Sequence, residues 1–135
     1  QCATAGGWLV SRMNRTQAAL WHLGVGKVEA LADPFATKLT DALCLLAVTG
    51  RDSFAVMEKL TPLDLAAPDR DAPYLIQGPV LQIPAQIVVL RKSDPVTILM
   101  AFARGYGQAM AEALLDGGKE LGLRPGGERR VNGEQ

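Results

Sequence analysis

Leu43–Leu65, with the sequence LCLLAVTGRDSFAVMEKLTPLDL, is the stretch that decides the fold. Ala42–Val48 at its start is continuously apolar over seven residues, the pattern of a strand that is covered on both faces. Gly50 then turns the chain, and Asp52 or Ser53 caps the helix that follows. The stretch therefore predicts a buried strand, a tight turn and a short helix.

The predicted helix is amphipathic and ends at a proline. Its apolar side chains share one stripe: Phe54, Val56, Met57 and Leu60. Pro62 prevents continuation of the helix, because it lacks the backbone N–H and its ring clashes with the preceding turn. Ala66–Pro73 is polar and proline-rich, which predicts a surface loop.

Two β-rich runs follow this loop and are separated by a polar turn. Val80–Leu90 is strand-like, with Pro84 at a bulge or an edge position. The turn 92–95 leads into Val96–Phe102, a second strand-like run. The short polar connection predicts that the two strands form an antiparallel hairpin.

The last predicted element is a helix that begins near Tyr106 and ends at Gly122. Its apolar stripe follows a period of 3.6 residues and consists of Tyr106, Met110, Ala113, Leu114, Gly117 and Leu121. Residues 124–135 contain almost nothing apolar, which predicts a disordered C-terminal tail. Residues 1–123 are then a single domain.

The N-terminal region predicts two short strands around a helix. Trp8–Val10 reads as a strand after a glycine turn, and Asn14 caps a helix that runs to Leu23. Gly24 offers a left-handed stop for that helix. Val25–Leu31 is the second candidate strand.

From residue 42 onward the predicted order is β-α-β-β-α, which places the chain in the α+β class. The order matches a ferredoxin-like split βαβ module that lacks its last strand. Either Trp8–Val10 or Val25–Leu31 is a candidate for the missing strand.

Composition narrows the classes of partner and site. The 135 residues contain 14 Lys and Arg against 14 Asp and Glu, and a net charge of zero argues against nucleic acid or an anionic membrane as the main partner. A near-zero charge also favours a surface that another subunit covers. One histidine and two cysteines give no metal-site spacing, and Cys44 in its apolar run predicts a small buried hydrophobe. Since no apolar run approaches about 18 residues, we expect a soluble cytoplasmic protein.

Four phrases of the sequence resemble one family. They are Gly7-Trp8, LGVGKVEAL at Leu23–Leu31, VTGRDSFAVMEKLTPLDL at Val48–Leu65, and ALLDGGKELGLRPGGERR at Ala113–Arg130. Together they resemble the aminomethyltransferase-like family, to which the glycine cleavage T protein belongs. The resemblance implies an α+β folate-binding module and a link to one-carbon metabolism.

Within that family the chain is most similar to the gamma subunit of heterotetrameric sarcosine oxidase. Aminomethyltransferases proper are about three times longer, and they hold the pteridine with acidic groups just before the last helix. The corresponding stretch here, Ile98–Gly107, has no acidic residue. A buried pterin edge without a polar partner is costly, so the gamma subunit is the better match, and Phe102–Leu115 resembles its ending.

The resemblance implies a non-catalytic subunit of an amine-oxidising or demethylating complex that passes one-carbon units to tetrahydrofolate. Its expected partners are flavin- and folate-bearing subunits or further copies of itself, and it binds no cofactor directly. The alternative is a stand-alone folate-binding or aminomethyltransferase-like domain, with tetrahydrofolate as its ligand. We assign no catalytic residue and no metal ligand.

Four residues are candidate ligand contacts, each with a plainer structural role beside it. Asp64 is expected to handle an amine near folate or to cap the turn after Pro62, and Tyr106 is expected to stack on a pterin. Arg104 enters a helix through a glycine-rich turn and is able to contact a carboxylate or phosphate. Arg51 is placed to bind an anion at a helix N-terminus, where neighbouring Asp52 instead favours simple capping.

His22 is the only histidine of the sequence and has no acid near it along the chain. A general base needs an orienting acid. An ordinary, partly exposed residue is therefore the preferred interpretation of His22.

Overall fold

The structure is a computed structural model, and it describes residues 2–24, 32–93 and 95–126. Within them lie two antiparallel β-sheets and two α-helices, which confirms the α+β class. The small sheet has the order β1-β2-β3: β1 Cys2–Ala5, β2 Trp8–Arg12 and β3 Ala18–His22. The large sheet has the order β4-β7-β6-β5: β4 Leu43–Thr49, β5 Tyr74–Val80, β6 Ile83–Arg91 and β7 Thr97–Ala103.

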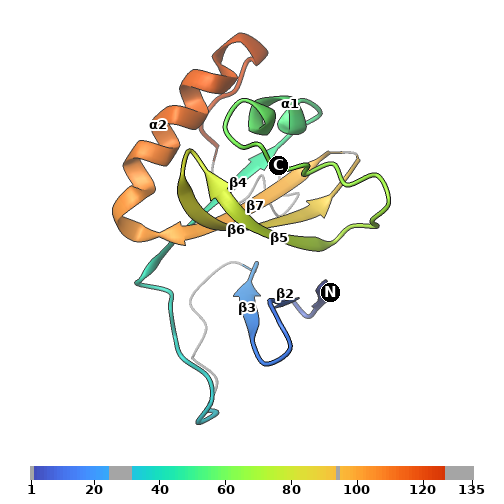
Figure 1. The fold of residues 1–135 in the computed structure, drawn as a ribbon, viewed down its shortest axis with the longest axis vertical. Helices are drawn as coiled ribbons and strands as arrows, with labels where there is room; N and C mark the ends of the chain where they lie inside the picture. Colours follow the sequence, from blue (N-terminus) through green and yellow to red (C-terminus); the bar gives the residue numbers. More distant parts are fainter. Residues whose placement is uncertain (1, 25–31, 94, 127–135) are drawn as a thin grey trace.

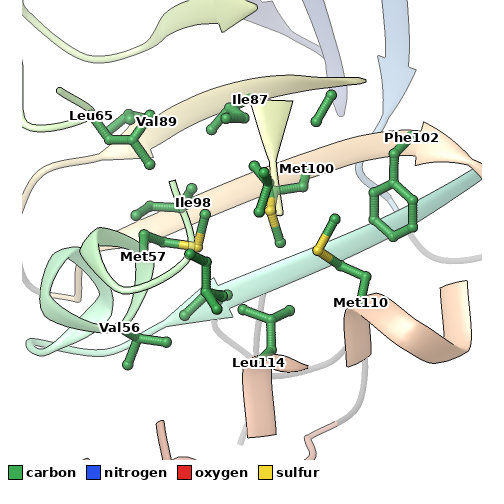
Figure 2. Packing of buried hydrophobic residues seen from close by; sticks show 14 of the residues in the cluster. Val56, Met57, Leu65, Ile87, Val89, Ile98, Met100, Phe102, Met110 and Leu114 are labelled. Carbon is green, nitrogen blue, oxygen red and sulfur yellow. The ribbon is translucent and has the colours of Figure 1, made fainter. Parts of the chain in front are cut away.

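The helices and the small sheet lie on opposite faces of the large sheet (Figure 1). Helix α1 is Ser53–Glu58 and helix α2 is Gly107–Gly118; the 3-10 turns η1, Arg104–Tyr106, and η2, Lys119–Leu121, flank α2. On the helix side, the methionines Met57, Met100 and Met110 meet in the core with at most 1% of their surface exposed (Figure 2). Strand β7 is buried along nearly its whole length, as expected for a central strand covered on both faces.

The second face of the large sheet packs against the small sheet. Leu9 and Trp21 of the small sheet join Leu75, Val88 and Leu99 of the large sheet in one apolar cluster. Burial of apolar surface on both faces explains how 135 residues form a three-layer arrangement with two cores.

The predicted helix from Asn14 to Leu23 is wrong, because Ala18–His22 forms strand β3. Asn14 accepts a hydrogen bond at Oδ1 from the Thr16 backbone N–H at 2.9 Å, so it closes a turn rather than capping a helix. Trp21 pairs with Leu9 across the resulting hairpin and is buried against the large sheet. Tertiary packing has therefore overridden local helix propensity.

Trp8–Val10 is confirmed as a strand, as part of β2, but it does not complete the large sheet. It pairs only within the small sheet, so the expectation that it fills the gap in the main sheet is wrong. The other candidate strand, at residues 25–31, lies outside the described residues.

The strand and helix predicted in the fold-deciding stretch are confirmed as β4 and α1. Ser53 donates its hydroxyl to the Gly50 carbonyl at 2.7 Å, whereas Asp52 occupies the N-cap position without a side-chain capping bond. The expectation that this strand is covered on both faces is confirmed in part. One face packs in the helix-side cluster through Cys44, Leu46 and Val48, and the other packs against the small-sheet cluster through Leu43 and Ala47. Leu45 remains 48% exposed, and the strand lies at the edge of the sheet.

The predicted order β-α-β-β-α lacks one strand, because β5 lies between α1 and the hairpin. The loop at Ala66–Pro73 is confirmed, but the run predicted from Val80 is divided: Val80 ends β5, and β6 begins at Ile83. Between them Leu81 and Gln82 have positive φ angles of 53° and 67°, as a tight hairpin turn requires. Gly78 and Pro79 inside β5 hid the strand from sequence reasoning, since both residues are rare in strands.

The hairpin of β6 and β7 and the final helix are confirmed. Pro84 occupies an edge position, because it pairs with Pro79 of β5 while the pairing with β7 starts at Ala85. Met110 and Leu114 are the buried centre of the α2 stripe, and Gly122 ends the helical segment in a left-handed conformation with φ 78°. None of the helices within the described residues has the length and apolarity needed to cross a membrane.

Candidate functional site: a groove along the edge strand

A cavity of about 510 Å³ follows β4 on the side away from β7. Three segments that are distant in sequence line it, together with residues of α1 and β7. The lining residues are His22–Gly24, Leu45–Ser53, Val56, Leu99, Leu121–Arg124 and Gly126. The cavity is therefore a groove whose base is a sheet edge.

The register of β4 fixes which of its backbone groups face this groove. The Arg104 N–H donates to the Ala42 carbonyl and the Gly50 N–H donates to the Val96 carbonyl, one at each end of the β4–β7 pairing. Hydrogen-bonded pairs alternate with non-bonded pairs in an antiparallel ladder. The even-numbered residues of β4 therefore bond to β7, and the odd-numbered residues point their N–H and C=O groups away from it.

Leu45, Ala47 and Thr49 are the odd-numbered residues that line the groove. Over residues 2–24, 32–93 and 95–126, no hydrogen bond engages the outward backbone groups of these three residues. Leu43, at the start of the strand, instead donates its N–H to Leu39 at 3.1 Å. The groove thus presents a short row of donors and acceptors spaced two residues apart.

One wall of the groove is the segment after α2, Leu121–Arg124. The Leu123 N–H donates to the Gly118 carbonyl at 3.0 Å. A Cβ atom added to Gly118 would lie only 2.5 Å from the Leu123 side chain. Glycine at position 118 therefore lets the segment fold back against the helix.

The other wall belongs to the small sheet. The His22 ring meets Trp8 edge to face with centroids 5.0 Å apart, and the neighbouring Leu23 N–H donates to Gly7 at 2.7 Å. The Trp8 contact fixes the imidazole beside the groove, and within the described residues no carboxylate is bonded to His22. The interpretation of His22 as an ordinary, partly exposed residue agrees with this placement.

Of the four predicted contact residues, Arg51 lines the groove. Its side chain is 95% exposed and lies 3.8 Å from the Asp52 carboxylate, whose side chain is 45% exposed. An ion pair this exposed contributes little to stability, so the guanidinium remains available to an acidic group.

Asp64, Arg104 and Tyr106 are not among the groove residues within the described part of the chain. Asp64 accepts a hydrogen bond at Oδ1 from the Ala67 N–H at 3.3 Å, in agreement with its plainer role of capping a turn. Arg104 donates from Nη1 to the Asp41 carbonyl at 3.4 Å. Tyr106 is 49% exposed. Ligand contacts by these residues stay a prediction.

A polar cluster around Tyr74 escaped sequence reasoning. The Tyr74 hydroxyl donates to the carbonyls of Leu65 at 2.5 Å and Ala66 at 3.0 Å. The Arg70 guanidinium and the Lys92 ammonium lie 4.7 and 5.0 Å from its ring centroid. Burial raises the pKa of Tyr74 above its ordinary value, whereas Arg70 lowers it and Asp64 raises it.

The Tyr74 cluster holds the loop before β5 against the large sheet. Lys92 donates to the carbonyls of Ala67 and Arg70 in the loop, and Arg70 donates to the Leu75 carbonyl of β5, so both cations have structural partners. No sequence motif links Tyr74 to Lys92, which is why the cluster was missed. We assign it to stability rather than to binding.

The groove combines backbone donors and acceptors with charged side chains. Among the described residues no cluster of three or more His, Cys, Asp or Glu side chains is able to hold a metal ion. The charged side chains among the described lining residues are those of Arg51, Asp52 and Arg124. The outward amides and carbonyls of Leu45, Ala47 and Thr49 are groups of the kind with which an added strand pairs.

Comparison with known proteins identifies no relative. No model of a protein family matches the chain, and neither a curated protein nor a solved structure is similar enough to be matched.

Proposed function

We propose that the chain is a small non-catalytic subunit, similar to the gamma subunit of sarcosine oxidase. It belongs to a cytoplasmic amine-oxidising or demethylating complex that passes one-carbon units to tetrahydrofolate. Its fold is then a ferredoxin-like module of the aminomethyltransferase-like family, elaborated by an additional strand and a small sheet. Its partners are the subunits that carry flavin and folate.

One observation carries the proposal: the groove along β4, whose outward backbone groups have no partner within the described part of the chain. A free strand edge is a liability in a protein that stays alone, because it templates pairing with other chains. In a subunit, the same edge is an attachment surface. The zero net charge and the four family-like phrases of the sequence add support.

The test is affinity purification of the tagged chain from its native host, followed by mass spectrometry and measurement of bound flavin and folate. We expect flavin- and folate-bearing proteins at a fixed molar ratio to the bait. A bait that purifies alone as a stable monomer contradicts the proposal.

The alternative function is a stand-alone folate-binding domain, and the groove volume favours it. A volume of about 510 Å³ lies within the usual range of small-molecule sites. The residues fit a pterin poorly, however. The carboxylate among the groove residues is Asp52, which is 45% exposed and lies 3.8 Å from Arg51, so no buried acid meets the pterin edge.

Titration with tetrahydrofolate decides between the two functions. The alternative predicts micromolar binding that Asp64→Ala weakens. Because Asp64 lies outside the described lining of the groove, Arg51→Ala is the variant that tests whether the groove itself holds the ligand. A flat titration of the unaltered chain removes the alternative and leaves the subunit proposal standing.

A further inference from the structure

Among the described residues, the edge of β4 has none of the usual protecting devices. Natural sheets protect an edge with lysine, proline, a bulge or a covering segment. The strand sequence LCLLAVT contains neither a charged residue nor a proline, and its pairing with β7 continues without a bulge. Within the described residues nothing hydrogen-bonds to the outward groups of Leu45, Ala47 and Thr49.

The groove has a shape that suits one extended segment. Its base is the edge of β4, and the two walls are Leu121–Arg124 and His22–Gly24. A single strand of about five residues, at about 3.4 Å per residue, spans the outward groups from Leu45 to Thr49.

The side chains at the groove define the chemistry of this segment. Leu45 on the edge strand is 48% exposed, and Leu121 on one wall is 39% exposed, so apolar side chains of an occupant gain contacts there. Among the described lining residues, Arg51 and Arg124 outnumber the carboxylate of Asp52. An occupant with an acidic residue therefore complements the groove.

We propose that the groove along β4 binds an extended segment of a partner protein, which adds a fifth strand to the large sheet. The segment alternates apolar side chains and carries a carboxylate that meets Arg51 or Arg124. The proposal rests on the proposed function, since it names the surface through which the subunit holds its partner.

Amide hydrogen exchange on the unliganded full chain is the first test. The register predicts slow exchange at Cys44, Leu46 and Val48, which donate to β7, and fast exchange at Leu45 and Ala47. Protection of Leu45 and Ala47 in the free monomer means that the chain itself occupies the edge. That result overturns the proposal, as does protection that appears only with rising concentration and dimer formation.

The second test selects binders from a displayed library of random dodecapeptides, with the full chain as target. We expect alternating apolar and acidic peptides that slow exchange at Leu45 and Ala47. Ala47→Pro is expected to weaken them about tenfold, because it removes one outward N–H. The matched variant Ala47→Val keeps that N–H and is expected to bind normally, and Arg51→Ala should reduce the acidic preference.

Selected peptides that bind equally well to both Ala47 variants, or that protect residues elsewhere, overturn the proposal. Failure of this proposal and failure of the proposed function are distinguishable. Recovery of flavin- and folate-bearing partners that leave amide exchange in β4 unchanged contradicts only the proposed binding at the groove. Peptides that protect β4 while no such partner is recovered contradict only the proposed complex.

Discussion

The two edges of the large sheet differ in how their backbone groups are engaged. At β5, the Leu75 carbonyl accepts a hydrogen bond from Arg70 at 3.3 Å, and the Pro79 carbonyl accepts one from Thr61 at 2.7 Å. Pro79 also has no N–H to expose. At β4, the described residues offer no such partners to Leu45, Ala47 or Thr49. The connection from α1 to β5 thus engages carbonyls of the β5 edge, which we call the closed edge, whereas no described residue engages the outward groups of Leu45, Ala47 and Thr49 at the other edge.

The largest difference is expected between substitutions at two neighbouring residues of β4 whose backbone N–H groups point in opposite directions. Val48→Pro removes an N–H that bonds to β7 and replaces a buried side chain, so we expect a loss of about 3 kcal/mol or more in unfolding free energy. Ala47→Pro removes an N–H that points into the groove, and proline is tolerated there. We expect a loss of about 1 kcal/mol in urea denaturation.

Equal losses for the two proline variants would contradict the register that assigns the outward groups of β4. Val48→Ala serves as the control for the lost side chain alone. It keeps the N–H, so the difference between Val48→Ala and Val48→Pro isolates the backbone contribution.

At the closed edge, the largest single contribution is expected from the hydroxyl of Tyr74. Tyr74→Phe leaves the carbonyls of Leu65 and Ala66 without their donor in a buried place, which costs about 1–3 kcal/mol. Chemical denaturation measures this loss. Tyr106→Phe is the matched control, since that residue is 49% exposed, and we expect a change below about 0.5 kcal/mol.

The same hydroxyl gives the closed edge a dependence on alkaline pH. Burial raises the pKa of Tyr74 above its ordinary value of 10.0. The folded chain therefore holds the proton to higher pH than the unfolded chain, and the contribution is complete below the unfolded pKa. We expect stability to fall as pH rises from that value through the folded pKa, and Tyr74→Phe to remove this component. An unchanged alkaline slope would contradict it.

The sequence predicted the elements whose signals are local. The apolar run of β4, the stripe of α1 and the 3.6-residue period of α2 each appear where the pattern indicates. Strand β3 was taken for a helix, because Ala18–Leu20 has no periodicity that separates the two possibilities and Trp21 gains its place only by packing on the large sheet.

The candidate site was harder to predict than the fold. Arg51 was found through its position before a helix, but the groove depends on which edge of the sheet stays open. That depends on the order β4-β7-β6-β5, a tertiary property that no local pattern encodes. Because the sequence did not predict β5, it did not predict the second edge strand of the large sheet either.

A smaller effect is expected at Thr61, which covers the closed edge directly. Thr61→Val keeps the shape of this buried side chain but leaves the Pro79 carbonyl without its donor, so we expect a loss of about 1–1.5 kcal/mol. Thr61→Ser keeps the hydroxyl and should recover most of the hydrogen-bond contribution in thermal or urea unfolding. A serine variant as unstable as the valine variant would assign the loss to packing instead.

The smallest effect is expected at Gly78 in β5, against which Leu63 of the connection from α1 packs. A Cβ at this position would lie 2.7 Å from Cδ1 of Leu63, the flexible end of a side chain, so Gly78→Ala forces only a small shift. The alanine also restricts the unfolded chain, which favours folding by about 0.4–1 kcal/mol. We expect the two contributions to leave a net change within about 1 kcal/mol.

A double-mutant cycle with Leu63→Ala separates these two contributions. With the Leu63 side chain shortened, the contact at Gly78 is gone, and Gly78→Ala should stabilise the chain by about 0.4–1 kcal/mol. Destabilisation in the Leu63→Ala background would mean that the β5 backbone itself requires glycine at this position. The closed edge would then depend on the strand's own conformation as well as on the segment that covers it.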